Sequence, residues 1–96
     1  MDHGRWKTAG FNPATVKRIT TLTDRNAHTE ALILGAEMLG ASGVVKKLKL
    51  VLQLHNLEGH LPTPLGEYRR ILYEEVMRLA KQSLDREQFQ SFYGAF

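Results

Sequence analysis

Three points in this 96-residue chain carry the residues that begin α-helices. Asn12 precedes Pro13, and Thr63 precedes Pro64, so each pair joins a capping side chain to a proline that suits the first helical turn. Asp85 stands three residues before a glutamine, which is the spacing of a capping box. These start signals predict a chain built from helices rather than from a sheet.

The apolar residues between these signals recur three and four positions apart, which is the period of an amphipathic helix. They predict an all-α fold, a compact bundle of four to five short helices that associates as a homodimer. The expected helices run from Asn12 to about residue 25, from residues 23–26 to Leu39, over 43–57, over 64–84, and from Asp85 to the C-terminus.

The segment 43–57 supports two interpretations. Four leucines, the first of them Leu48 and the last Leu54, alternate with other residues as in a strand. Helical spacing instead gathers Val44, Leu48 and Val51 on one side together with two further apolar residues, Val45 and Leu52. Leucine forms helices better than strands, and no other segment alternates to supply a partner strand. We therefore predict a helix, capped by Ser42 and ended by Gly59.

Length and composition predict one folded domain over residues 12–96, with residues 1–11 as a flexible tail. The chain is 43% hydrophobic and 24% charged, as in an ordinary globular protein. It contains no cysteine, which excludes disulfides and cysteine zinc sites and favours a cytoplasmic protein; we expect a bacterial one. No apolar run reaches the roughly 20 residues that span a bilayer, and the polar first ten residues predict no secretory signal. Trp6 in the tail is expected to pack on the domain or on a partner.

Several of the expected helices carry more apolar surface than one neighbour can cover, and this surplus predicts self-association. The aromatic stripe at the C-terminus is the predicted interface. Its residues are Phe89, Phe92, Tyr93 and Phe96. The alternative is that the last helix folds back and that these rings close the core of their own chain.

A second hypothesis concerns nucleic acid. Residues 36–49 resemble the core of a helix-turn-helix, in which an alanine, a glycine four residues later and a following serine mark the turn. The resemblance implies that Lys46, Lys47 and Lys49 would face DNA, and the net charge of +3 is compatible with an anionic partner. However, Lys46 and Lys49 stand where that family places apolar residues. DNA binding is therefore the runner-up function.

A third hypothesis is a small-molecule or metal-binding helical protein. Its candidate pocket is lined by Tyr68, Tyr73, Met77, His55 and His60. His55, Glu58 and His60 could hold a metal ion, but their spacing matches no known metal motif, so we predict no metal and no cofactor.

Catalytic signatures are missing from the sequence. It contains no Gly-x-Ser-x-Gly, no phosphate-binding loop and no Gly-x-Gly-x-x-Gly, and we predict no catalytic residue. The expected function is thus that of a non-enzymatic helical protein that acts through self-association or partner binding.

Overall fold

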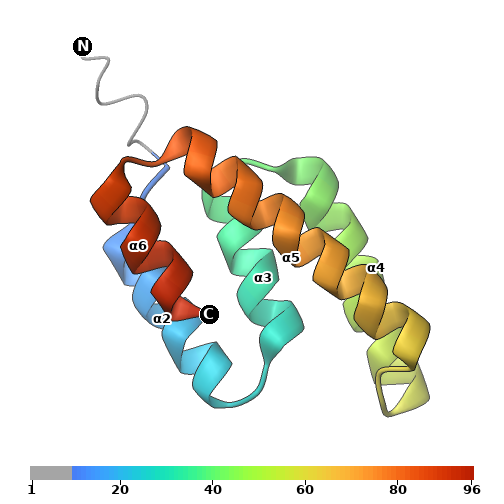
Figure 1. Cartoon of the computed structure of the whole chain (residues 1–96). Helices are drawn as coiled ribbons and strands as arrows, with labels where there is room; N and C mark the ends of the chain where they lie inside the picture. Colours follow the sequence, from blue (N-terminus) through green and yellow to red (C-terminus); the bar gives the residue numbers. More distant parts are fainter. Residues whose placement is uncertain (1–9) are drawn as a thin grey trace.

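The computed structural model describes residues 10–96, and over that range it contains five α-helices and no strand. The helices are α2 (Pro13–Asp24), α3 (His28–Met38), α4 (Ser42–Glu58), α5 (Thr63–Ser83) and α6 (Arg86–Ala95), shown in Figure 1. The predicted all-α class is confirmed. Most of the predicted tail, including Trp6, lies outside the described residues.

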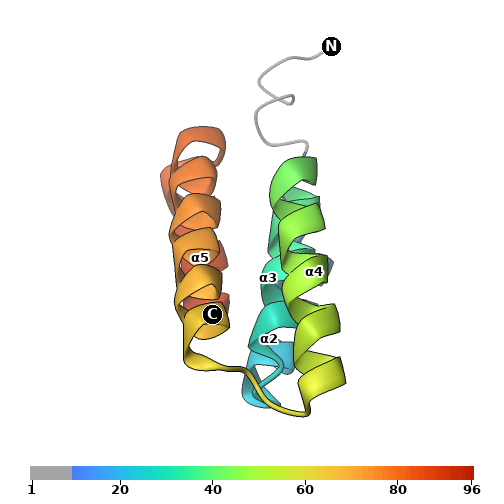
Figure 2. The ribbon, with the colours of Figure 1, turned by 90° about the vertical axis from the view of Figure 1, so that its right-hand side faces the viewer.

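The helices form two layers. α2, α3 and α4 lie side by side in one layer, and α5 and α6 cover one face of it (Figures 1 and 2). α5 crosses α3 and α4, while α6 returns along α2 and α3 packs between α2 and α4. Within 10–96, no helix is both long enough and apolar enough to cross a membrane.

The core lies between the two layers. Its largest fully buried side chains come from four helices: Ile19, Leu48, Val51, Val76 and Phe92. α3 is apolar on most sides because it has neighbours on most sides, and Ala31 and Ala36 are completely buried there. On α5, Leu72 and Val76 are buried together with Met77 and Ala80, and Leu84 directly after the helix is buried as well.

Two helix starts agree with the sequence. The Asn12 side chain accepts hydrogen bonds from the backbone N–H groups of Ala14 at 2.9 Å and Thr15 at 3.4 Å. Asp85 accepts from the N–H of Gln88 at 2.8 Å, and the Gln88 side chain accepts from the N–H of Asp85 at 3.2 Å. Each cap satisfies backbone donors that the first turn of a helix leaves free.

The predicted starts of the other three helices are wrong by one to a few residues. Ser42 is not the cap of α4 but its first helical residue, because Gly40, with φ of +74°, turns the chain so that Ala41 takes the cap position. Pro62 takes the cap position of α5, so Thr63 is already helical. The predicted second helix begins only at His28. Asn26 adopts φ of +63°, a left-handed conformation that interrupts the helical backbone between α2 and α3.

Residues 42–58 form a helix, which confirms the helical interpretation of that segment. Helical spacing brings Val44, Leu48 and Val51 into the core, whereas alternation would have divided them between two faces. Gly59 ends α4 as predicted, with φ of +80° and an N–H that donates to the carbonyl of His55 at 2.9 Å.

Candidate interaction surface

The most distinctive surface of the described chain lies on the α4–α5 hairpin, which consists of α4, the connection 59–62 and α5. α4 and α5 are adjacent and run in opposite directions, and Figure 2 views them from the side on which no other helix covers them. Five large apolar side chains are exposed along this hairpin. They are Leu50, Leu54, Leu57, Tyr68 and Ile71, and we call them the outer face.

Helical spacing explains why these residues share one side of the hairpin. Leu50, Leu54 and Leu57 are four and three residues apart and so lie on one stripe of α4. Tyr68 and Ile71 form a matching stripe on α5. Leu57 is 74% exposed, Ile71 61% and Leu50 54%, so burial of the inner stripes leaves the outer face uncovered. Contiguous apolar surface of this kind marks interaction sites in water-soluble domains.

Charged residues border the outer face at both ends. Near the start of α4 stands Lys47, and beside it on α5 stand Glu75 and Arg78, whose side chains form an ion pair at 2.6 Å. The hydrogen bond from Arg78 and the nearby charge of Lys47 lower the pKa of Glu75 from its ordinary value. Glu58 and Glu67 stand at the opposite end, next to the connection. One end is therefore net basic and the other acidic.

The predicted aromatic interface lies on α6, away from the outer face. Phe92 is fully buried in the core of its own chain, and Phe89 and Phe96 are half-buried against that core. The rings of Phe92 and Phe96 meet edge to face with centroids 5.1 Å apart. Tyr93 alone of the four is more than half exposed. The last helix thus closes the core, which was the alternative left open, and Phe92 has no free surface for a partner.

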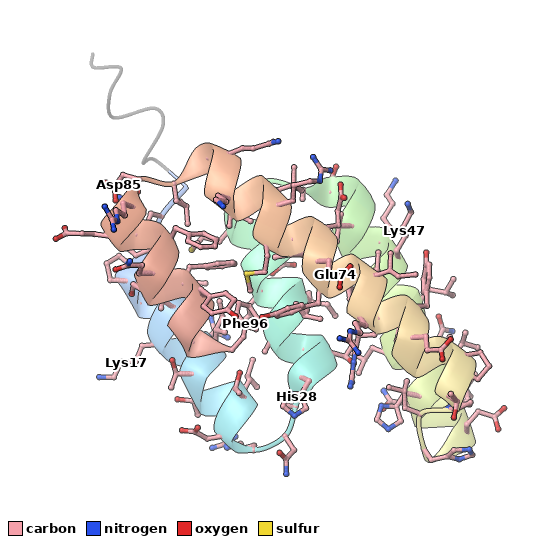
Figure 3. All side chains as sticks on the ribbon, in the orientation of Figure 1. Lys17, His28, Lys47, Glu74, Asp85 and Phe96 are labelled. Carbon is pink, nitrogen blue, oxygen red and sulfur yellow. The ribbon has the colours of Figure 1, made fainter. Side chains whose placement is uncertain are left out.

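The three lysines of the nucleic-acid hypothesis are exposed on α4, after a tight turn from α3. They do not share a face. Lys46 and Lys49 are three residues apart, but Lys47 lies about 100° around the helix from Lys46 and stands beside Glu75 (Figure 3 labels Lys47). Leu50 also occupies the exposed side of α4 that would have to approach the phosphates. The geometry therefore gives this hypothesis no added support.

The five residues of the predicted ligand pocket do not converge. Tyr68 and Tyr73 are five residues apart on α5 and so point about 140° away from each other. Tyr68 belongs to the outer face, whereas Tyr73 lies edge to face with Phe96, with ring centroids 6.1 Å apart. Met77 is buried in the core, His60 is exposed, and His55 lines a different cavity of about 210 Å³.

That cavity contains a polar contact that the sequence did not reveal. Arg69 donates from Nη1 to the hydroxyl of Thr29 at 3.0 Å, across 40 positions of sequence. Thr29 is buried, and partial burial lowers the pKa of Arg69 from its ordinary value. The contact links α3 to α5 at the end of the core.

Removing the Thr29 hydroxyl tests the strength of this link. Thr29→Ala is expected to lower the unfolding free energy by about 1–2 kcal/mol, because it leaves a partly buried guanidinium without this acceptor. Urea denaturation followed by circular dichroism measures the change. Thr21→Ala is the control, since the Thr21 hydroxyl is exposed and donates only to its own helix. Equal effects of the two changes would show that the Arg69 contact contributes nothing.

A second concave region lies on α2, α3 and α4, away from the hairpin's outer face. It has a volume of about 470 Å³ and a floor of Leu22, Ile33, Leu34 and Leu52. Its rim carries both signs of charge, with Arg18 and Lys49 opposing Glu30. The cleft is open to solvent and offers no convergent polar groups that would define a ligand.

Within the described residues, no group of three or more histidine and acidic side chains is placed to hold a metal ion. His60 instead makes a local contact, with its Nδ1 3.2 Å from the carbonyl oxygen of Glu58. The three residues considered from the sequence, His55, Glu58 and His60, therefore make local contacts where α4 ends.

Comparison of the chain with known protein families, with curated proteins and with solved structures finds no match in any of the three.

Proposed function

We propose that this chain is a non-enzymatic helical protein that acts through self-association or partner binding, and that the outer face is its contact surface. The observation that carries the proposal is the cluster of Leu50, Leu54, Leu57, Tyr68 and Ile71, exposed on two neighbouring helices. We favour this surface over the aromatic stripe of α6 as the contact surface because Phe92 is enclosed by its own chain.

The size of the outer face supports a real contribution to binding. Its exposed fractions add up to about two and a half whole side chains, and burying one whole leucine or isoleucine contributes about 1.5–3 kcal/mol. Several kilocalories per mole are thus available on this side of an interface. Because association itself has a cost of similar size, we expect a complex of micromolar rather than nanomolar strength.

Site-specific photo-crosslinking in cells that naturally produce the chain tests this proposal. A photoreactive amino acid at Ile71 is expected to form covalent protein adducts, because this position would lie inside the interface. The same amino acid at Asn56 is the matched control, since Asn56 is exposed on α4 but lies about 100° or more around the helix from each leucine of the outer face.

A third position separates the two candidate surfaces. Tyr93 is the exposed residue of the predicted aromatic interface. Adducts at Tyr93 with none at Ile71 would assign the contact to α6 and contradict the proposal. Adducts of equal yield at Ile71 and Asn56 would show only random collision and would also contradict it.

A further inference from the structure

The residues of the outer face have the spacing of helices that pack against other helices, but no helix of this chain covers them. On α4 the residues Lys47, Leu50, Leu54 and Leu57 follow spacings of three, four and three. On α5 the residues Tyr68, Ile71, Glu75 and Arg78 repeat the same spacings. Alternation of three and four is the pattern by which helices pack into bundles with a shared apolar centre. The hairpin therefore offers two parallel stripes, which a second pair of helices would complete as a four-helix bundle.

The charges at the ends of these stripes define which pair of helices fits. Lys47 and Glu58 are eleven residues apart on α4, and Glu67 and Arg78 are eleven residues apart on α5. Each pair spans about 16 Å, or three turns. Because α4 and α5 run in opposite directions, Lys47 and Arg78 lie towards one end of the hairpin, and the two glutamates lie at the other (Figure 2).

We propose that the partner of the outer face is a second copy of this chain, bound so that the two α4–α5 hairpins form an antiparallel four-helix bundle. The twofold axis crosses the helices at right angles, midway along both stripes. With this axis, α4 of one copy packs against α4 of the other copy, and α5 packs against α5 of the other copy. Lys47 then meets Glu58 of the other copy, and Arg78 meets its Glu67. This inference rests on the proposed function of the outer face.

Self-complementarity is the reason for choosing a second copy. An isologous interface requires one patch to fit itself after a half-turn, and the α4 stripe, with its basic end, apolar centre and acidic end, does so. On α5 the charge of Arg78 is shared with Glu75 of the same helix, so the α4 stripe carries most of the charge complementarity. A twofold axis parallel to the helices would instead place basic ends on basic ends, which charge repulsion disfavours. Glu74 lies on the front of α5 (Figure 3), about 60° around the helix from Ile71.

Charge reversal on α4 tests both the partner and the orientation. Sedimentation equilibrium of the purified full chain is expected to show a dimer with a dissociation constant in the micromolar range. Lys47→Glu and Glu58→Lys are each expected to weaken it about tenfold, since each turns two symmetric attractions into repulsions. The double variant restores opposite charges across the axis and is expected to return within about threefold of wild type. All four residues involved are exposed, and circular dichroism verifies that every variant stays helical.

The results that overturn this inference are distinct from those that overturn the proposed function. The antiparallel arrangement would be refuted if both single changes weaken the dimer and the double change does not restore it. A wild-type chain that stays monomeric at about 100 µM would refute the second copy as partner. In either case, adducts that form at Ile71 but not at Asn56 would leave the proposed function standing. Conversely, a dimer that persists unchanged in Ile71→Glu but is lost in Tyr93→Glu would refute both.

Discussion

Replacing Phe92 with alanine is expected to lower the unfolding free energy of this chain by about 3–5 kcal/mol. Phe92 is the largest fully buried side chain, and its ring joins α6 to the rest of the core. Alanine would leave a cavity that the surrounding helices fill only in part, so both the lost burial and the lost contacts contribute. Urea denaturation followed by circular dichroism measures the loss, which is a large part of the total stability of a domain this small.

Tyr93→Ala is the matched control for this change. It removes a ring from the next residue of the same helix, but Tyr93 is 54% exposed, stacks on the half-buried Phe89 and interacts with the hydroxyl of Tyr73. We expect a loss below about 1.5 kcal/mol there. If Phe92→Ala instead remained as stable as wild type and merely became monomeric, α6 would be an interface helix, as the sequence first predicted, and its packing in the structure would be contradicted.

The sequence predicts best those features that depend on neighbouring residues. The Asn12 cap and the Asp85 capping box each involve partners no more than three residues away, so their residue types determine them. The helix starts near Ser42 and Thr63 were predicted less well because two adjacent residues could serve as the cap. The backbone settles the choice in each case, through the positive φ of Gly40 and the extended ψ of Pro62.

The helical spacing of α4 predicts an apolar side that includes Leu48 and Val51, but it does not predict whether a neighbour also covers the second apolar stripe. Its inner stripe contains Leu48 and Val51, and its outer stripe contains Leu50 and Leu54, which are chemically alike. The positions of α3 and α5 decide which stripe is covered, and those positions depend on contacts far apart in sequence. The same limit explains Phe92: the aromatic stripe is visible in the sequence, but the helix that covers it is not.

One signal could have located the outer face beforehand. The stripe of Leu50, Leu54 and Leu57 has a lysine three residues before it and a glutamate one residue after it, and the shorter apolar stripe of Tyr68 and Ile71 on α5 also has a glutamate before it and an arginine beyond it. A core stripe seldom carries charges of opposite sign at its two ends, whereas antiparallel partners use such charges to set their orientation.

Two helices, α3 and α6, approach each other closely in the core at Gly35. Gly35 lies buried in the middle of α3, where glycine normally destabilises a helix by about 1 kcal/mol relative to alanine. The structure shows what this glycine permits. A Cβ atom built there would lie 2.9 Å from the Cζ atoms of both Phe92 and Phe96, closer than carbon atoms tolerate. The two rings can therefore pack against α3 only because residue 35 has no side chain.

Gly35→Leu is expected to lower the unfolding free energy by about 3 kcal/mol, even though leucine is the better helix former, because the added side chain must displace the buried Phe92 ring.

Gly35→Ala and Gly43→Ala form a matched pair of smaller changes. Gly43 is also helical, but a Cβ there meets nothing within 4 Å, so Gly43→Ala should raise stability by up to about 1 kcal/mol while Gly35→Ala lowers it. Thermal and urea denaturation measure all three. Phe96→Ala provides room beside residue 35, so the cost of Gly35→Ala should shrink in that background. If both alanine changes stabilised the chain equally, the contact of α6 with α3 would be looser than the structure shows, and the α6 rings would again be free to meet a partner.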